Sequence, residues 1–204
     1  MNGFHMGAGM RTLIGLLAAV ALAVPGRASA AQWGLSAEVG VARFGGTSRD
    51  SSGATLGPYR PTTFGARLDR ELGPGRVGIG LLYARTGLAG EQDQTAVVFY
   101  DRASLVEAAP EISLRVARFG GGVVTRVAGG PSLDIWDVDG VSRTRVGARG
   151  AVALEWPLSG RCIGSLRATG VLSGSMMNRD ETPAGVERRA TRRGGVSIEL
   201  RYRL

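Results

Sequence analysis

After about residue 31, apolar and polar residues alternate with a period of two. The last segment shows this most clearly, because apolar residues occupy every second position there: Val196, Ile198, Leu200, Tyr202 and Leu204. Successive side chains of a strand point to opposite faces, so this period predicts strands with one apolar and one polar face. Helical periodicity is hard to find in the same part of the chain, and we expect an all-β fold.

We expect eight such strands. Pro110 lies inside the fourth, and since proline has no N–H to donate to a neighbouring strand, a local irregularity is expected there. The segments are about 33–41, 62–72, 77–83, 104–119, 123–135, 146–156, 161–174 and 196–204.

The connections between these segments alternate in length. Glycine and proline mark tight turns at 73–75, 120–122 and 157–160. The other connections are longer, at about 45–60, 87–103, 137–144 and 174–192. Strict alternation of short and long connections is typical of an eight-stranded, antiparallel up-and-down barrel that crosses a membrane. Both ends of the barrel then fall on the short-turn side.

Alternation alone does not say which face points inward, since a soluble lipocalin-like barrel would bury the apolar face. Two features favour an apolar face against lipid. Aromatic residues of that face lie at strand ends, as in membrane-interface girdles: Trp33, Trp156 and Tyr202 at one rim, Phe64 and Tyr83 at the other. The polar face also has nearly balanced charge, which suits a narrow lumen. Its members are Arg67, Arg115, Arg126, Arg149, Arg167, Arg201, Glu38, Asp69, Glu107, Glu111, Asp134, Glu155 and Glu199.

Residues 1–30 have the features of a secretory signal peptide. Arg11 precedes an apolar run from Thr12 to Val24, and Ala28-Ser29-Ala30 fits the small-x-small pattern that precedes cleavage. The run is too short for a membrane-spanning helix. We therefore expect a cleaved signal peptide at 1–30, a barrel domain at 31–204, and export to the outer membrane.

Four segments carry a resemblance to a known family. They are Leu81–Gly87 (LLYARTG), Leu105–Pro110 (LVEAAP), Ala128–Leu133 (AGGPSL) and Leu200–Leu204 (LRYRL). In their order and spacing they resemble the bacterial outer-membrane β-barrel domain family, a porin-like group of eight-stranded barrels in the Gram-negative cell envelope. The resemblance implies recognition of the last strand by the barrel-assembly machinery. That machinery commonly reads a terminal Phe, and Leu204 departs from this pattern, which affects the expected efficiency of assembly rather than the fold.

The chain lacks the usual partners for catalysis. An acyl-transfer serine needs a base, but the only histidine, His5, lies in the expected signal peptide, so Ser132, Ser173 and Ser175 have no such partner. Asp137 and Asp139 precede Gly140 in a pattern more typical of a turn than of a carboxylate pair or calcium loop. The single cysteine, Cys162, has small apolar neighbours and is interpreted as a packing residue. We expect no enzyme, no catalytic, cofactor-binding or metal-binding residues and no cofactor.

The remaining hypotheses concern what a barrel of this size does. An eight-stranded barrel is just wide enough for side chains to fill it, and the long charged residues here would plug it. We expect a monomer with a structural or adhesion-like surface-interaction role, in contact with outer-membrane lipid, with 45–60 and 174–192 as the loops that meet any extracellular ligand. A small pore and a soluble lipocalin-like periplasmic binding barrel remain as alternatives. All 25 basic residues are arginine, but they are scattered among acids, so nucleic acid is not an expected partner.

Overall fold

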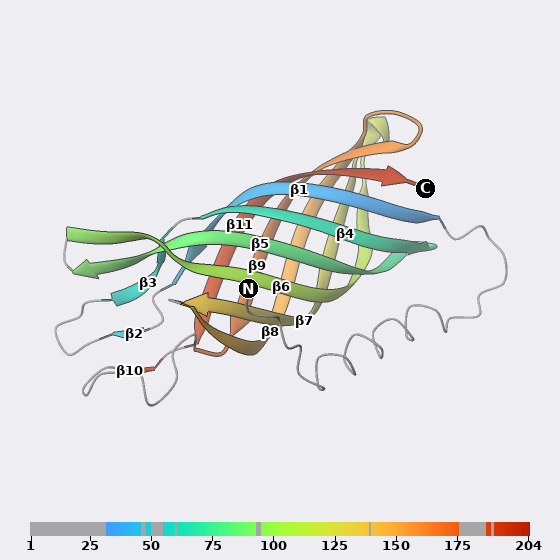
Figure 1. Ribbon diagram of the computed structural model, residues 1–204. Helices are drawn as coiled ribbons and strands as arrows, with labels where there is room; N and C mark the ends of the chain where they lie inside the picture. Colours follow the sequence, from blue (N-terminus) through green and yellow to red (C-terminus); the bar gives the residue numbers. More distant parts are fainter. Residues whose placement is uncertain are drawn as a thin grey trace, which may run out of the picture. The chain divides into compact units, whose positions relative to one another are not determined.

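The alternating segments form long strands that pair in sequence order (Figure 1). The computed structural model describes residues 32–45, 48–49, 55–59, 61–92, 95–138, 140–175, 187–188 and 190–204. The expected signal peptide lies outside them. The eight long strands are β1 (Trp33–Phe44), β4 (Thr62–Leu72), β5 (Gly75–Gln92), β6 (Thr95–Arg118), β7 (Val124–Val138), β8 (Val141–Pro157), β9 (Cys162–Ser173) and β11 (Thr191–Arg203).

These eight strands close into an antiparallel barrel. Each pairs with the next along the chain, and the circle is completed where β1 pairs with β11 from Gly34↔Arg203 to Phe44↔Arg193. One further hydrogen bond extends this seam, because the N–H of Leu204 donates to the carbonyl of Trp33 at 2.9 Å. The expected eight-stranded up-and-down topology is confirmed.

The two faces of the wall are the ones that the alternation predicts. Ile198 is 63% exposed on the outer surface, whereas its neighbour Glu199 is 5% exposed and points into the lumen. The same inversion recurs on the other strands, where Leu35 and Val152 are exposed beside buried Ser36 and Ala151. Apolar side chains therefore cover the outside of the barrel, and charged side chains fill its interior.

The three tight connections are where glycine and proline place them. Gly73 and Pro74 join β4 to β5, and residues 158–161 join β8 to β9. A short 3-10 turn, η1 (Gly120–Gly122), joins β6 to β7. Gly73 and Gly121 have φ angles of 61° and 69°, which glycine adopts without the strain that a side chain would cause.

Two of the four expected long connections are wrong. The strands continue through most of 87–103, because β5 runs to Gln92 and β6 begins at Thr95. They also continue through most of 137–144, where β7 and β8 are joined at residues 139 and 140. In both places the ladder of hydrogen bonds between partner strands extends past glycine and polar residues that by themselves resemble a loop.

The extended hairpin of β5 and β6 projects beyond the ends of β1 and β4 (Figure 1). A short strand, β3 (Thr55–Tyr59), pairs with the projecting part of β5, from Thr55↔Glu91 to Tyr59↔Gly87. Two more short strands, β2 (Ser48–Arg49) and β10 (Glu187–Arg188), continue this sheet. The expected loop segments 45–60 and 174–192 thus contribute strands to a sheet at the long-loop end, and their other residues lie partly outside the described ones.

The irregularity expected at Pro110 is present. Pairing of β6 with β7 is interrupted between Ala108↔Leu133 and Ile112↔Gly129, with no change of register. Pro110 faces the stretch that contains Pro131, so both strands lack an N–H donor at the same point. A true register shift occurs farther along β6, between Arg115 and Ala117.

Aromatic side chains lie at both rims of the outer surface, as expected. Phe64 and Tyr83 are cross-strand partners near the long-loop end and are 56% and 45% exposed. At the short-turn end the guanidinium of Arg70 lies over the ring of Trp33, 5.9 Å from its centroid. Within the described residues, no helix is both long and apolar enough to cross a membrane.

Candidate functional site

The long-loop end of the lumen is closed by an apolar cluster. Phe44 of β1 and Trp136 of β7 meet edge to face, with ring centroids 5.4 Å apart and planes at 68°. Leu82 and Leu105 pack against them from β5 and β6, and Trp136 and Leu105 are completely buried. This cluster separates the charged part of the lumen from the projecting hairpin.

Glu107 of β6 lies directly below the apolar cluster and is completely buried. Its carboxylate accepts a hydrogen bond from Nη1 of Arg149 at 2.7 Å and another from Nη2 of Arg193. The three residues come from β6, β8 and β11, so this group spans the lumen. A single buried carboxylate would cost several kcal/mol, and the two guanidinium groups offset that cost.

A second set of ion pairs occupies the middle of the barrel. Nη2 of Arg67 lies 3.0 Å from Oε2 of Glu199 and 3.5 Å from Oε2 of Glu38. Arg167 donates to Glu111 on the opposite side of the lumen. These contacts connect β1, β4, β6, β9 and β11, and they leave the lumen filled from wall to wall.

The short-turn end is closed by a third set of ion pairs. Glu155 accepts from Nη1 of Arg76 at 2.5 Å and from Nε of Arg126 at 3.1 Å. Arg126 also donates to the carbonyl of Pro74 in the β4–β5 turn at 3.1 Å. Arg201 binds Asp69 through Nε and Nη2, the paired geometry that suits a guanidinium and a carboxylate.

Glycines on neighbouring strands make room for these long side chains. A Cβ atom added to Gly34 would collide with the guanidinium of Arg201, and one added to Gly65 would lie 2.5 Å from Oε1 of Glu38. The remaining space is small. A cavity of about 10 Å³ is lined mainly by charged groups, and one of about 20 Å³ is lined mainly by uncharged residues beside Glu38, Arg149 and Arg193. Each has room for a single water molecule rather than a water column.

Comparison with solved structures agrees with this architecture. The structure of Neisserial surface protein A aligns with a TM-score of 0.59 at 11% identity, over 84% of this chain and 97% of that one. Outer membrane protein OprG from Pseudomonas aeruginosa aligns with a TM-score of 0.50 at 11% identity, over 86% and 96% of the two chains. The chain has the fold of these eight-stranded outer-membrane β-barrels. No protein-family model and no curated protein sequence matches it.

The lumen of the barrel holds most of the predicted charges. All seven predicted carboxylates and five of the six predicted arginines face inward. Arg115 is the exception: it is still in register with inward-facing Arg126, but its side chain is exposed near the short-turn end of β6. The prediction that Arg115 is one of the charges enclosed in the lumen is therefore wrong.

Sequence reasoning missed three lumen ions and one core aromatic. Arg76 directly follows the β4–β5 turn and Arg193 lies beside the expected loop 174–192, so both are outside the expected strands. Glu71 falls within the expected strand 62–72 but is not among the inward charges predicted for it. Their inward positions follow from the parity of their strands. Trp136 shares the parity of Asp134, and this signal could have placed it inside the barrel.

The residues considered for catalysis have structural surroundings. Ser132 and Ser173 are buried inward-facing residues of β7 and β9. The carboxylate of Asp137 accepts a hydrogen bond from the N–H of Gly140 at 3.1 Å, so the expected turn is present there, although Asp139 lies outside the described residues. Cys162 begins β9, and its N–H donates to Oγ of Ser159. Among the described side chains, no group of three or more His, Cys, Asp or Glu is arranged to hold a metal ion.

Proposed function

We propose that this chain is a protein of the bacterial outer membrane with a structural or adhesion-like surface-interaction role and a lumen that does not conduct. The barrel is not an enzyme in this proposal, and it acts as a monomer. The observation that carries the proposal is the filled lumen, in which an apolar cluster and three sets of ion pairs lie between the two ends.

The outer surface supports placement in a membrane. Val39, Leu81, Ile112 and Leu166 are each exposed by more than two fifths, and they lie on different strands around the barrel. A soluble lipocalin-like barrel would direct such residues into its interior to bind an apolar ligand. The observed arrangement is the reverse, and it disfavours that alternative.

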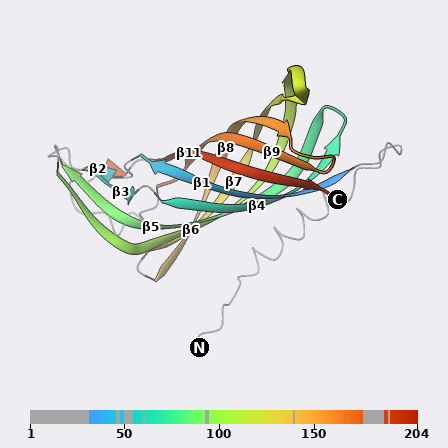
Figure 2. The same ribbon diagram turned by 90° about the horizontal axis from the view of Figure 1, so that it is seen from above.

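The sheet at the long-loop end supports a surface-interaction role. The β5–β6 hairpin and β3 project beyond the barrel, while the opposite end has only tight turns (Figure 2). Binding residues on barrel scaffolds are carried by the segments that a rigid wall positions. We infer that segments 45–60 and 174–192 and the hairpin between them face the outside of the cell, and that the C-terminal strand directs assembly despite Leu204.

Planar-bilayer recording with purified protein tests the closed lumen. The expected result is an absence of steady channels, because the ion pairs leave no continuous path for water. Rare and irregular openings would agree with a plugged barrel. Steady, ion-selective channels of uniform size would contradict the proposal and support the small-pore alternative.

A further inference from the structure

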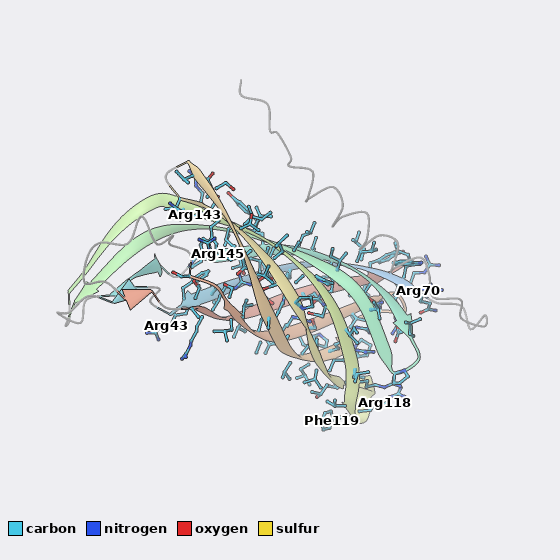
Figure 3. The ribbon with its side chains drawn as sticks, turned by 90° about the horizontal axis from the view of Figure 1, so that it is seen from below. Arg43, Arg70, Arg118, Phe119, Arg143 and Arg145 are labelled. Atoms are coloured by element: carbon cyan, nitrogen blue, oxygen red, sulfur yellow. The ribbon has the colours of Figure 1, made fainter. Side chains whose placement is uncertain are left out.

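Two exposed arginines lie side by side on the outer surface at the long-loop end. Arg43 belongs to β1 and is paired in register with Gly194 of β11. The N–H of Gly45 donates to the carbonyl of Arg192 at 2.7 Å, so the register continues and Arg192 is the diagonal neighbour of Arg43. Such neighbours lie about 7–8 Å apart. Figure 3 shows the side chain of Arg43 pointing away from the barrel wall.

The two guanidinium groups have no countercharge among the described residues. Neither is joined to another described side chain by an ion pair or hydrogen bond. Their nearest outward-facing neighbours on the same strands are Val41 and Gly194, which carry no charge. Among the residues that the structure describes, the arginine pair is therefore an uncompensated positive site at the long-loop end of an apolar surface.

A strip of the barrel wall without side chains, called the groove below, leads away from this pair. Its floor follows the register of four adjacent strands, in which Gly194 pairs with Gly170, Gly170 with Gly150, and Gly150 with Gly129. All four positions face outward by the parity of their strands. A Cβ atom added to Gly170 or Gly194 would meet no heavy atom within 4 Å, so the floor there is open space.

Apolar side chains border the groove on both sides. The next outward-facing row on the short-turn side is formed by Val196, Ala168, Val152 and Val127. On the long-loop side the row begins with Arg192 and continues through Leu172, Ala148 and Pro131. The backbone N–H and C=O groups of these strands already pair with one another, so they are not available to an occupant of the groove. The groove therefore offers apolar contact along its length and positive charge at one end.

The groove also runs in the direction that a membrane lipid requires. Gly194 lies near the start of β11 at the long-loop end, whereas Gly129 lies closer to Val124, the short-turn end of β7. Strands are about 4.8 Å apart, so the distance from Arg43 across to β7 is about 19 Å. Strands of such barrels tilt by about 35–45°, so this path descends by roughly 12 Å, most of one leaflet of a hydrocarbon core of about 30 Å.

We propose that Arg43, Arg192 and this groove bind one phosphate-bearing lipid of the outer leaflet. The guanidinium groups donate hydrogen bonds to the phosphate oxygens, and one acyl chain lies along the glycine floor. Charge complementarity selects the phosphate, and the length and direction of the groove select a lipid over a free anion. The proposal rests on the membrane placement proposed above.

Native mass spectrometry on the protein refolded in dodecyl maltoside tests this site. The probes are dipalmitoyl phosphatidic acid and dipalmitoylglycerol, which have the same chains and differ in the phosphate. Faster migration of unboiled than of boiled protein on gels establishes for each sample that the barrel has formed. The wild type is expected to bind phosphatidic acid about tenfold more tightly than the uncharged lipid, as charge-assisted hydrogen bonds imply.

Two pairs of variants separate the headgroup from the chain. R43Q/R192Q should abolish the preference for phosphatidic acid, whereas R118Q, at an exposed arginine near the opposite rim, should retain it. G170V/G194V fills the open floor and should weaken both lipids alike by about tenfold or more. Its control is A66V, an added pair of methyl groups on the outer face of β4 away from the groove, which should change neither.

Equal lipid preference in R43Q/R192Q and R118Q would overturn the phosphate site. Unchanged binding in G170V/G194V, or complete displacement of phosphatidic acid by millimolar inorganic phosphate, would overturn the groove and leave only an anion site. These outcomes differ from the one expected if the protein is not a membrane barrel. If the membrane placement is wrong, the protein will be soluble without detergent and will show no heat-dependent migration.

Discussion

A buried charge in this barrel is stable only through its partners, and Glu107 is the clearest case. It has no exposed surface, and the two guanidinium groups that bind it belong to strands far apart in the sequence. Removing one member of such a group leaves the others desolvated without compensation. Each ion of the lumen therefore acts as a contact between strands as well as a filler of space.

Replacing Glu107 with Gln tests this at one position. The amide keeps the shape of the side chain but removes the charge that Arg149 and Arg193 share. We expect the free energy of unfolding to fall by about 3–5 kcal/mol, with less lost if water enters the lumen. Urea titration of the refolded barrel in lipid vesicles measures this free energy of unfolding. D137N, at an exposed carboxylate in a turn, should change it by less than about 0.5 kcal/mol, and equal losses in the two variants would contradict the argument.

The lumen shows what alternation can and cannot predict for single residues. Glu155 and Arg149 are both inward as predicted, yet they do not pair with each other, because the lumen brings Arg149 to Glu107 and Glu155 to Arg76 and Arg126. Strand parity gives the face of a residue. Its partner depends on the tilt and closure of the whole barrel, which no local pattern contains.

At the scale of the strands, each of the eight has two classes of position with different requirements. Outward positions tolerate apolar side chains of many sizes, while inward positions must fit the space left by the opposite wall.

The errors in the predicted strand boundaries have a different origin, which is pairing between strands beyond the barrel. The sequence around 87–103 contains glycine, aspartate and glutamine, and the strands persist there because β3, β5 and β6 hydrogen bond to one another beyond the barrel.

A matched pair of substitutions on β8 tests the lipid-facing band. Val152 and Val141 are 51% and 49% exposed, but Val152 lies within the barrel wall and Val141 at the end of the β7–β8 hairpin. In vesicles, V152R should lower the free energy of unfolding by about 2–4 kcal/mol, and V141R by about 0–1 kcal/mol. A soluble barrel would tolerate both changes equally. Equal, small losses would therefore show that the outer face does not meet lipid.

The whole molecule has two ends of different character. One carries the projecting sheet and the arginine pair, and the other carries tight turns and the exposed residues Arg118 and Phe119 (Figure 3). This asymmetry is the basis for assigning the long-loop end to the outside of the cell. The alternation of short and long connections was enough to predict that the two ends differ, even though two of the expected long connections are mostly strand.

Trypsin applied to intact cells tests this orientation. Segments 45–60 and 174–192, which the proposal places outside the cell, contain cleavable residues, namely Arg49, Arg179, Arg188 and Arg189. We expect cleavage there without permeabilising the cells, while Arg118 and Arg161 near the other end are cut only after the membrane is opened. The fragments are identified by mass spectrometry of the membrane fraction. Cleavage restricted to permeabilised cells would place the sheet on the periplasmic side.

The seam between β1 and β11 imposes an order on folding. Every other pair of the eight long strands joins neighbours along the chain, so each can form as a local hairpin. The seam instead joins the first strand to the last and must close the longest loop in the molecule. Until β11 reaches β1, two strand edges of the barrel wall carry unpaired backbone groups. We expect closure of the seam to be the last step of folding, and it converts an open sheet, able to pair with any free strand, into a wall with no free edge.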